Sequence, residues 1–332
     1  MKQLFIFFLL LQGGAYAQVP LAELSQVRTA SGKIIFQYQG SAYTGSAISY
    51  HENGNMNTLR NFQKGRPSGK WTTYDEAGKV LDTGDETHLY YQALFLPPQG
   101  YEDASPSFTE TGNYMVFARY VVWGKKVPYI AEKIDGEWIP ERLPFADTVY
   151  NLAISPEGTR IVYTTADEVE IRRAYYVDKE DDSWGAAVEI TAFEGIYAGY
   201  FQIMKDGSLY FFAREPKIGI YYAEASQDGS YGTPRWLSDE VSLADGDSFD
   251  AFLHPGKEKL IISQYYSQQQ FPERGEVGMY YYEKADGRWE RQKRLPLSYG
   301  WGATITPDNT FIFVRNGMIQ HLPLADLGIA WE

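Results

Sequence analysis

The pattern of apolar and polar residues along the chain repeats at intervals of about 50 residues. One copy, residues 151–184, contains three short runs rich in β-branched and aromatic residues, NLAI, RIVY and AYYV. The turn SPEG separates the first two runs, a polar loop separates the second from the third, and the acidic turn DDSW follows the third. Such short runs bounded by turn residues predict β-strands, and a lone meander of this size cannot bury both of its faces. We therefore expect several copies to pack against one another.

Four more turns of the same kind place further copies on both sides of residues 151–184. The corresponding turn positions along the chain are Gly112, Gly158, Gly207, Lys257 and Asn309. Each turn is followed five positions later by an apolar or aromatic residue, and the complete copies continue into a tyrosine-rich run. Units of four short strands at this spacing are typical of the blades of a β-propeller. The sequence therefore predicts an all-β fold dominated by a propeller.

The last copy lacks its fourth strand. After residues 311–314 and 318–322 no strand-like run follows, whereas residues 88–96 form an unassigned run before the first complete copy. A closed ring cannot leave one blade with an unpaired outer edge, because such an edge invites association with other chains. We therefore expect residues 88–96 to supply the missing strand and close a ring of five blades. The alternative of six blades requires another pair of strands within residues 239–250.

Two of the turns resemble those of a known propeller family. The sequences ISPEG at residues 154–158 and TITPD at residues 304–308 resemble the Ser-Pro-Asp-Gly repeats of WD-like propellers related to the TolB translocation protein. The turn at Gly112 lacks the proline, and the turn at Lys257 lacks the acidic-Gly pair, so the resemblance leaves the blade boundaries less defined than the fold. This resemblance implies a propeller, in a family that includes periplasmic interaction modules.

A shorter repeat precedes the propeller. Its aromatic, glycine, tyrosine and glycine positions recur 24 residues apart, as Tyr38, Gly45, Tyr50 and Gly54 and then Phe62, Gly69, Tyr74 and Gly78. The last glycine of each set lies where a hairpin turn needs a positive φ, which glycine adopts at low cost. The sequence FQKGRPSGKWTTY at residues 62–74 resembles the MORN-type repeat, in the variant of YwqK-like antitoxin proteins. The resemblance implies stacked β-hairpins that serve as a scaffold or interaction element.

Residues 1–17 have the features of a cleaved secretory signal peptide. A basic Lys2 precedes an apolar run and a small-x-small site, Ala15-Tyr16-Ala17. The run is too short for a permanent membrane anchor. The chain has no cysteine, and therefore neither disulfides nor a lipid-attachment site. We expect a periplasmic or secreted protein with a signal peptide at residues 1–17, a lead-in and two MORN-like repeats at residues 18–86, and a propeller at residues 87–332.

Composition and motifs exclude several functions. The net charge of −13 argues against a nucleic-acid partner, because phosphate binding requires a concentrated basic surface. The four histidines of the sequence are His51, His88, His254 and His321. No two of them have the spacing of a metal-binding pair. The sequence contains neither a Gly-x-Ser-x-Gly motif nor a phosphate-binding glycine loop. We therefore predict no cofactor and favour a protein that is not an enzyme.

The residue seven positions after each turn position is polar in every copy. These residues are Arg119, Thr165, Arg214, Gln264 and Asn316. They follow the second strand, where a loop would emerge at one face of a propeller, and rings of such side chains form ligand surfaces around the central opening. Two arginines in this ring would suit a carboxylate or phosphate. Polar residues are also common in any loop, so solvated loops are the alternative interpretation.

An acidic loop is a candidate calcium site. Asp245, Asp247 and Asp250 gather hard oxygen ligands close together, with Asp239 and Glu240 nearby, although the spacing does not match an EF-hand. Such residues are also common in solvated turns.

The sequence leads to two hypotheses for function. The preferred one is an exported, non-enzymatic propeller that binds a protein or another envelope component. The alternative is a glycan-binding or glycoside-hydrolase-like propeller. Hydrolysis would need two carboxylates on the central face, and Trp123 and Trp301 would stack on a sugar ring. No spacing in the sequence identifies such a pair of carboxylates.

Overall fold

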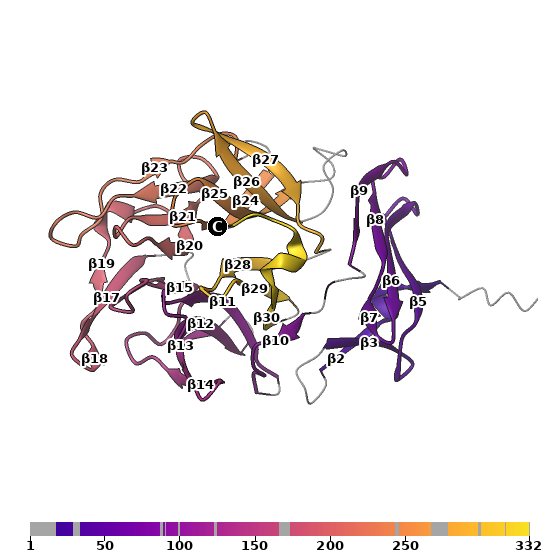
Figure 1. Cartoon of the computed structure of the whole chain (residues 1–332), viewed down its shortest axis with the longest axis horizontal. Coiled ribbons are helices and arrows are strands. Elements are labelled where there is room, and N and C mark those ends of the chain that lie inside the picture. Colours follow the sequence, from indigo (N-terminus) through magenta and orange to yellow (C-terminus); the bar gives the residue numbers. More distant parts are fainter. Residues whose placement is uncertain are drawn as a thin grey trace, which may run out of the picture.

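A computed structural model describes residues 18–331, except for residues 29–33, 87–88, 90, 99, 123–124, 166–172, 243–245, 267–277, 298–299 and 316. The predicted signal peptide, His88, Trp123, Asp245 and Asn316 therefore lie outside the described residues. Five of the sheets formed by the described residues are arranged around a common axis as a five-bladed β-propeller (Figure 1). The predicted all-β propeller with five blades is thus confirmed.

Blades 1 to 4 each run outward from the axis in chain order. Blade 1 consists of β11 (Glu102–Phe108), β12 (Tyr114–Val122), β13 (Lys125–Ile134) and β14 (Glu137–Arg142). Blade 2 consists of β15 (Asn151–Ile154), β16 (Arg160–Thr164), β17 (Ala174–Glu180), β18 (Ser183–Trp184) and β19 (Val188–Glu189). Blade 3 consists of β20 (Ala198–Ile203), β21 (Leu209–Ala213), β22 (Gly219–Ala223) and β23 (Arg235–Trp236). Blade 4 consists of β24 (Gly246–Leu253), β25 (Lys259–Tyr266), β26 (Gly278–Ala285) and β27 (Arg288–Arg294).

Blade 5 joins the two ends of the propeller. It consists of β28 (Trp301–Ile305), β29 (Thr310–Arg315), β30 (Met318–Pro323) and β10 (Gln92–Ala93). The early strand β10 pairs antiparallel with β30, and the Leu94 N–H donates to the Ile319 carbonyl at 2.8 Å. The predicted closure is therefore confirmed, with a strand shorter than the expected 88–96. Within the described part of residues 239–250, the only strand is the beginning of β24, which leaves no additional strand pair there.

The repeated turns connect the first and second strands of each blade. All five turn positions have a positive φ, including the two that are not glycine, Lys257 (60°) and Asn309 (57°). A left-handed residue is what these tight turns require, which explains why glycine occupies the other three positions. We call the face of the propeller that carries these turns the first-turn face.

Two small sheets precede the propeller and pack on each other. The larger contains β1 (Val19–Pro20), β5 (Gly45–Tyr50), β6 (Met56–Gln63), β7 (Arg66–Pro67), β8 (Lys70–Tyr74) and β9 (Val80–Asp85). The smaller contains β2 (Ser25–Arg28), β3 (Ile34–Tyr38) and β4 (Ser41–Ala42). Phe36, Tyr43 and Phe62 form the core between them. Both predicted glycine hairpins are present, with Gly54 at φ 86° and Gly78 at φ 83°.

These sheets, the N-terminal hairpin sheets, contact the propeller through buried polar groups. The Trp71 indole N–H donates to the Pro296 carbonyl at 3.3 Å, and the Arg294 guanidinium lies 4.4 Å from the centre of the Trp71 ring. Glu86 and Arg315 form an ion pair at 3.7 Å, and each side chain is 2% exposed. Burial, assisted by the charge of Arg60, lowers the pKa of Arg294 to about 9. The contact is therefore specific, because these buried charges need defined neighbours.

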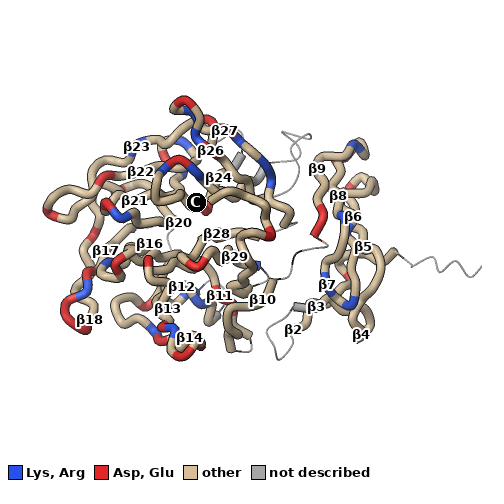
Figure 2. The backbone as a smooth tube through the Cα atoms, in the orientation of Figure 1, with Lys and Arg blue, Asp and Glu red and all other residues tan. Residues whose placement is uncertain are grey.

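Charged residues are concentrated along the outer hairpins, such as β13–β14, β17–β18 and β26–β27, whereas the first strands contain few (Figure 2). The helical elements of the described residues are the short 3₁₀ turns η1 (Leu21–Glu23), η2 (Thr191–Phe193) and η3 (Leu324–Leu327). Within the described residues, no helix has the length and apolar character needed to cross a membrane.

Candidate functional site

The first strands of the blades line the propeller axis, and most of them are bent. Within the described residues, β11, β20, β24 and β28 each contain a β-bulge, whereas β15 pairs regularly with β16. Each bulge holds a residue with positive φ, and these residues are Ser105 (54°), Tyr200 (55°), Asp250 (51°) and Gly302 (64°). All four lie seven positions before a turn position. A bulge changes the direction in which the side chains of a strand point. The repeat therefore places a residue with positive φ at the same sequence position in four of the strands that line the axis.

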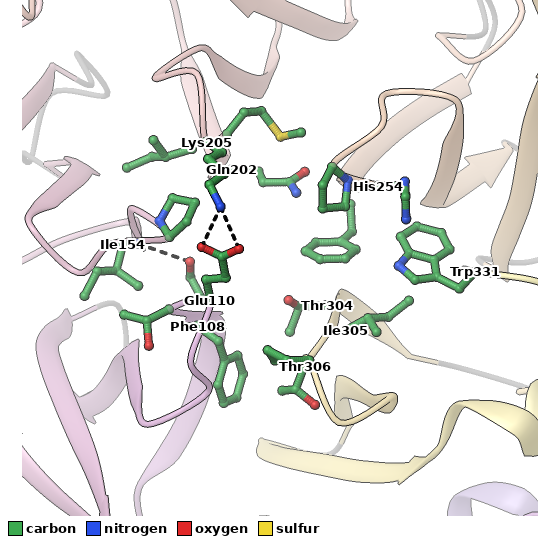
Figure 3. Close-up of a pocket in the computed structure, with 18 of the residues that line it drawn as sticks. Phe108, Glu110, Ile154, Gln202, Lys205, His254, Thr304, Ile305, Thr306 and Trp331 are labelled. Atoms are coloured by element: carbon green, nitrogen blue, oxygen red, sulfur yellow. Dashed lines mark hydrogen bonds and ion pairs between the residues drawn. The ribbon is translucent and has the colours of Figure 1, made fainter.

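A cavity of about 310 Å³ lies on the axis at the first-turn face (Figure 3). All five blades and the C-terminal segment contribute to this central cavity. Its apolar lining includes Phe108, Ile154, Ile203, Phe252, Ile305 and Trp331. The volume falls at the lower end of the range of small-molecule and side-chain binding pockets.

The C-terminal segment holds Trp331 in the wall of the central cavity. The Lys293 ammonium donates to the carbonyls of Leu327 and Gly328 at 2.7 and 2.6 Å. The Tyr281 hydroxyl donates to the Ala330 carbonyl at 2.6 Å. The Trp331 ring then stacks on Phe252 with 5.8 Å between ring centres. Blade 4 therefore fixes the position of this wall.

An ion pair spans the mouth of the central cavity. The Lys205 ammonium of blade 3 donates to both carboxylate oxygens of Glu110 of blade 1, at 2.9 and 3.1 Å (Figure 3). Both side chains are more than half exposed. The hydrogen bond and charge of Glu110 raise the pKa of Lys205. An exposed pair of this kind contributes little stability and separates easily, so it does not block entry.

A smaller cavity of about 50 Å³ continues along the axis beneath the central cavity. This channel cavity shares four lining residues with the central cavity: Ser107, Gln202, Phe252 and Thr304. Two of them join neighbouring blades. The Ser107 hydroxyl accepts a hydrogen bond from the Ile154 N–H at 3.1 Å, and the Gln202 amide exchanges two hydrogen bonds with Leu253. The four shared residues therefore form the boundary between the two cavities, and two of them are held in place by hydrogen bonds to neighbouring blades.

Asp250 lies in the channel cavity and is 6% exposed. One carboxylate oxygen accepts a hydrogen bond from the Gly302 N–H of blade 5 at 3.2 Å. Burial raises the pKa of Asp250 to about 7, although the Gly302 N–H and the positive charge of Lys126 oppose the rise. A carboxyl group with this pKa exchanges its proton near neutral pH, which is common at functional sites.

A third cavity of about 400 Å³ lies between blades 1 and 5, where the ring closes. This closure cavity shares Phe108, Thr306 and Pro307 with the central cavity. Its remaining lining is mixed and includes Lys133, Trp138, Asp308 and His321. The two cavities are thus neighbours on the first-turn face, separated by a common wall.

The ring of polar residues predicted from the sequence has mixed surroundings. Arg119 is buried and forms a bidentate ion pair with Asp103 at 2.7 and 3.0 Å. Gln264 is also buried and bonds to Val241, Ser248 and Tyr282. Arg214 is exposed beside the Tyr197 ring, and Thr165 is half-buried. A ligand surface at this ring stays a prediction.

The predicted calcium site also stays a prediction. Asp245 is outside the described residues, as is the side chain of Asp247, and Asp250 points into the propeller axis. Among the described residues, no group of three or more His, Cys, Asp or Glu side chains is placed to hold a metal ion. The predicted sugar-stacking residue Trp301 is half-buried and packs against the core between blades 1 and 5.

No protein-family model and no curated protein matches the chain. Similar solved structures include a putative TolB from Agrobacterium tumefaciens, with 17% identity, a TM-score of 0.44 and coverage of 70% of this chain and 73% of that chain. TolB from Acinetobacter baumannii has 12% identity, a TM-score of 0.47 and coverage of 84% and 78%. A gluconolactonase from Xanthomonas campestris has 12% identity, a TM-score of 0.42 and coverage of 70% and 89%. The assignment of five blades rests on the strand order described above.

Proposed function

We propose that this protein is a binding propeller that holds an extended segment of a protein partner on its first-turn face. One side chain of the segment would enter the central cavity, and a neighbouring part would occupy the closure cavity. The observation that supports this proposal is the common wall of the two cavities, formed by Phe108, Thr306 and Pro307. Two adjoining cavities suit an extended chain, because its side chains are spaced along a line.

The chemistry of the face also suits a protein partner. The apolar floor of the central cavity would bury an inserted side chain, whereas Glu110, Lys205 and His254 line the same cavity with polar groups. An apolar centre surrounded by polar groups is the usual composition of protein–protein interfaces. We place the interaction in the bacterial envelope or exterior because residues 1–17 have the features of a signal peptide.

The alternative of glycoside hydrolysis has weaker support in this geometry. Hydrolysis requires two carboxylates that flank the scissile bond. Among the described residues that line the central cavity, Glu110 supplies the one carboxylate, and it is paired with Lys205. Asp250 lines the channel cavity and not the central cavity. Binding without catalysis is therefore the function that the site supports better.

Selection of peptides tests the proposal. The purified protein would be presented with a random heptapeptide display library and, in parallel, with a glycan array. We expect selected peptides to bind the wild type, and Ile305→Asp to weaken this binding by roughly tenfold or more, because the variant places a charge in the apolar lining.

Ile139→Asp is the matched control, since Ile139 is 51% exposed on the outer strand β14. This variant should bind the selected peptides as the wild type does. Failure to select any peptide, or equal binding by Ile305→Asp, would overturn the proposal. Binding of a glycan that Ile305→Asp abolishes would favour the glycan alternative instead.

A further inference from the structure

The channel cavity indicates which kind of side chain the central cavity would bind. We propose that the central site selects a lysine side chain of the partner segment, whose ammonium group binds Asp250. This inference rests on the proposed function and adds the identity of the inserted residue.

The two axial cavities match the two parts of a lysine side chain. The stem of lysine is apolar and flexible, and it would pack on Ile154, Phe252 and Ile305 in the central cavity. The end of the side chain would then pass between Ser107, Gln202 and Thr304, at the boundary of the two cavities, into the channel cavity. An unbranched side chain is suited to such a path, whereas an aromatic or β-branched side chain would be held above it.

The geometry of the channel cavity favours an ammonium over a guanidinium group. Its volume is about 50 Å³, whereas a cavity measured in this way needs roughly 10–15 Å³ to hold one water molecule. The channel cavity therefore has room for an ammonium group. A compact ammonium group is similar in size to water, whereas the planar guanidinium group of arginine is larger and needs a flat, forked partner. We therefore expect discrimination between lysine and arginine.

Asp250 and Ser105 offer hydrogen-bond acceptors in the channel cavity. An ionised carboxylate accepts hydrogen bonds on both oxygens, and among the described residues the Gly302 N–H bonds to one oxygen of Asp250. The Ser105 hydroxyl oxygen is buried and has no hydrogen-bond partner among the described residues. Gln202 is already bound to Leu253 through both of its amide atoms. Asp250 and Ser105 would thus accept hydrogen bonds from an incoming ammonium group.

The groups near Asp250 compensate the negative charge of its ionised carboxylate only in part. The Lys126 ammonium donates to the Tyr150 carbonyl at 2.9 Å and lies 4.4 Å from the Tyr150 ring centre. The Tyr200 hydroxyl shares a 2.9 Å hydrogen bond with the Tyr150 hydroxyl. The charge of Lys126 lowers the pKa of Asp250 by less than burial raises it. A bound ammonium group would stabilise the ionised carboxylate of Asp250. The affinity of the site for an ammonium group should therefore rise as the pH increases through about 7.

The overall charge is consistent with a basic partner segment. The chain carries a net charge of −13, which attracts cationic ligands and increases their association rate. Lysine therefore agrees with the acceptors that Asp250 and Ser105 offer among the described residues, and with the charge of the whole protein.

Peptide selection at pH 8 tests the inference. The full chain of the wild type, Asp250→Asn and the control Asp286→Asn would each be presented with the random heptapeptide library. Asp286 is exposed in the turn between β26 and β27. We expect the wild type and the control to enrich lysine at one position, and Asp250→Asn to enrich neutral long side chains there instead.

Synthetic versions of a selected peptide, with lysine, arginine or norleucine at that position, would then be titrated calorimetrically. The wild type should bind the lysine peptide roughly tenfold more tightly than the other two at pH 8, and this preference should shrink at pH 6. Equal binding of the lysine and norleucine peptides, or a lysine preference that persists in Asp250→Asn, would overturn the inference.

The outcomes separate this inference from the proposed function. Selection of peptides without a lysine preference would leave the binding face intact and refute the role of Asp250. Titration of n-hexylammonium chloride tests Asp250 without any peptide: binding by the wild type but not by Asp250→Asn would support the ammonium site even if no peptide were selected. Absence of both kinds of binding would refute both proposals.

Discussion

At the residue scale, Asp250 links the stability of the propeller to pH. Its pKa is raised from 3.8 to about 7 by burial, so the folded protein keeps this proton over a range in which the unfolded chain has lost it. The contribution of Asp250 to the free energy of unfolding therefore falls as the pH rises from about 4 to about 7. Above pH 7, the free energy of unfolding is lower than at pH 4 by on the order of 4 kcal/mol because of Asp250.

Replacement of Asp250 by Asn should remove this cost. The amide oxygen can still accept the hydrogen bond from the Gly302 N–H, whereas the charge is lost. We expect Asp250→Asn to melt at a higher temperature than the wild type at pH 8 and at nearly the same temperature at pH 4. Circular dichroism melts at both pH values measure this difference, and a variant that melts lower at pH 8 would contradict the assignment.

Arg119 and Arg214 occupy equivalent sequence positions but differ in what they contact. Arg119 is buried against Asp103, whereas Arg214 is exposed. Removing one partner of a buried ion pair leaves an uncompensated charge, so Arg119→Ala should lower the free energy of unfolding by about 3–5 kcal/mol. Arg214→Ala should lower it by less than about 1 kcal/mol. Urea unfolding of both variants checks this contrast, and similar small losses in both would refute the structural role of Arg119.

The contrast between these arginines shows what spacing alone does not provide. The position seven residues after each turn is easily found, but the neighbours of that position depend on strand pairing. Asp103 and Arg119 are directly paired across β11 and β12, and both lie eight residues from Thr111 in the turn. The register next to the turn, with Phe108 opposite Met115 and Ser107 opposite Val116, would place Arg119 opposite Ala104. The bulge at Ser105 shifts the partner of Arg119 to Asp103, so the ion pair depends on a bulge that the repeat spacing did not reveal.

At the scale of elements, the turns were predictable and the bulges were not. Each turn needs a residue in the left-handed conformation, so glycine recurs at the turn positions, as at Gly112, Gly158 and Gly207. The bulges accommodate Ser105, Tyr200 and Asp250 at positive φ, residue types with no common signature. A bulge depends on the register between two strands, so the sequence alone suggested calcium for Asp250 rather than a position on the axis.

The closing strand β10 should be essential to the propeller. Residues 92–93 complete blade 5 by pairing with β30, and without them β30 would be an exposed edge. We expect a chain of residues 86–332, which keeps Glu86 beside Arg315, to remain folded and to elute without aggregates. A chain of residues 97–332 should melt at a lower temperature and aggregate. Size-exclusion chromatography and thermal melting compare the two, and identical behaviour would contradict the role of β10.

At the scale of the whole molecule, the five blades create the proposed site together. No blade alone forms the central cavity, because its lining comes from all five first strands or turns and from Trp331. Among the described residues, Trp71 and Glu86 contact Pro296, Arg294 and Arg315 of the propeller, and these three line neither the central nor the closure cavity. Their membership in the MORN family stays a prediction, as do export and the envelope partner.

Hydrogen–deuterium exchange of the full chain with and without a selected peptide tests the binding face most directly. The proposed function predicts slower exchange at residues 107–112 and 304–309, which form the turns around the central and closure cavities. Slower exchange confined to the N-terminal hairpin sheets, or to the loops that follow the second strands near Thr165 and Arg214, would contradict it.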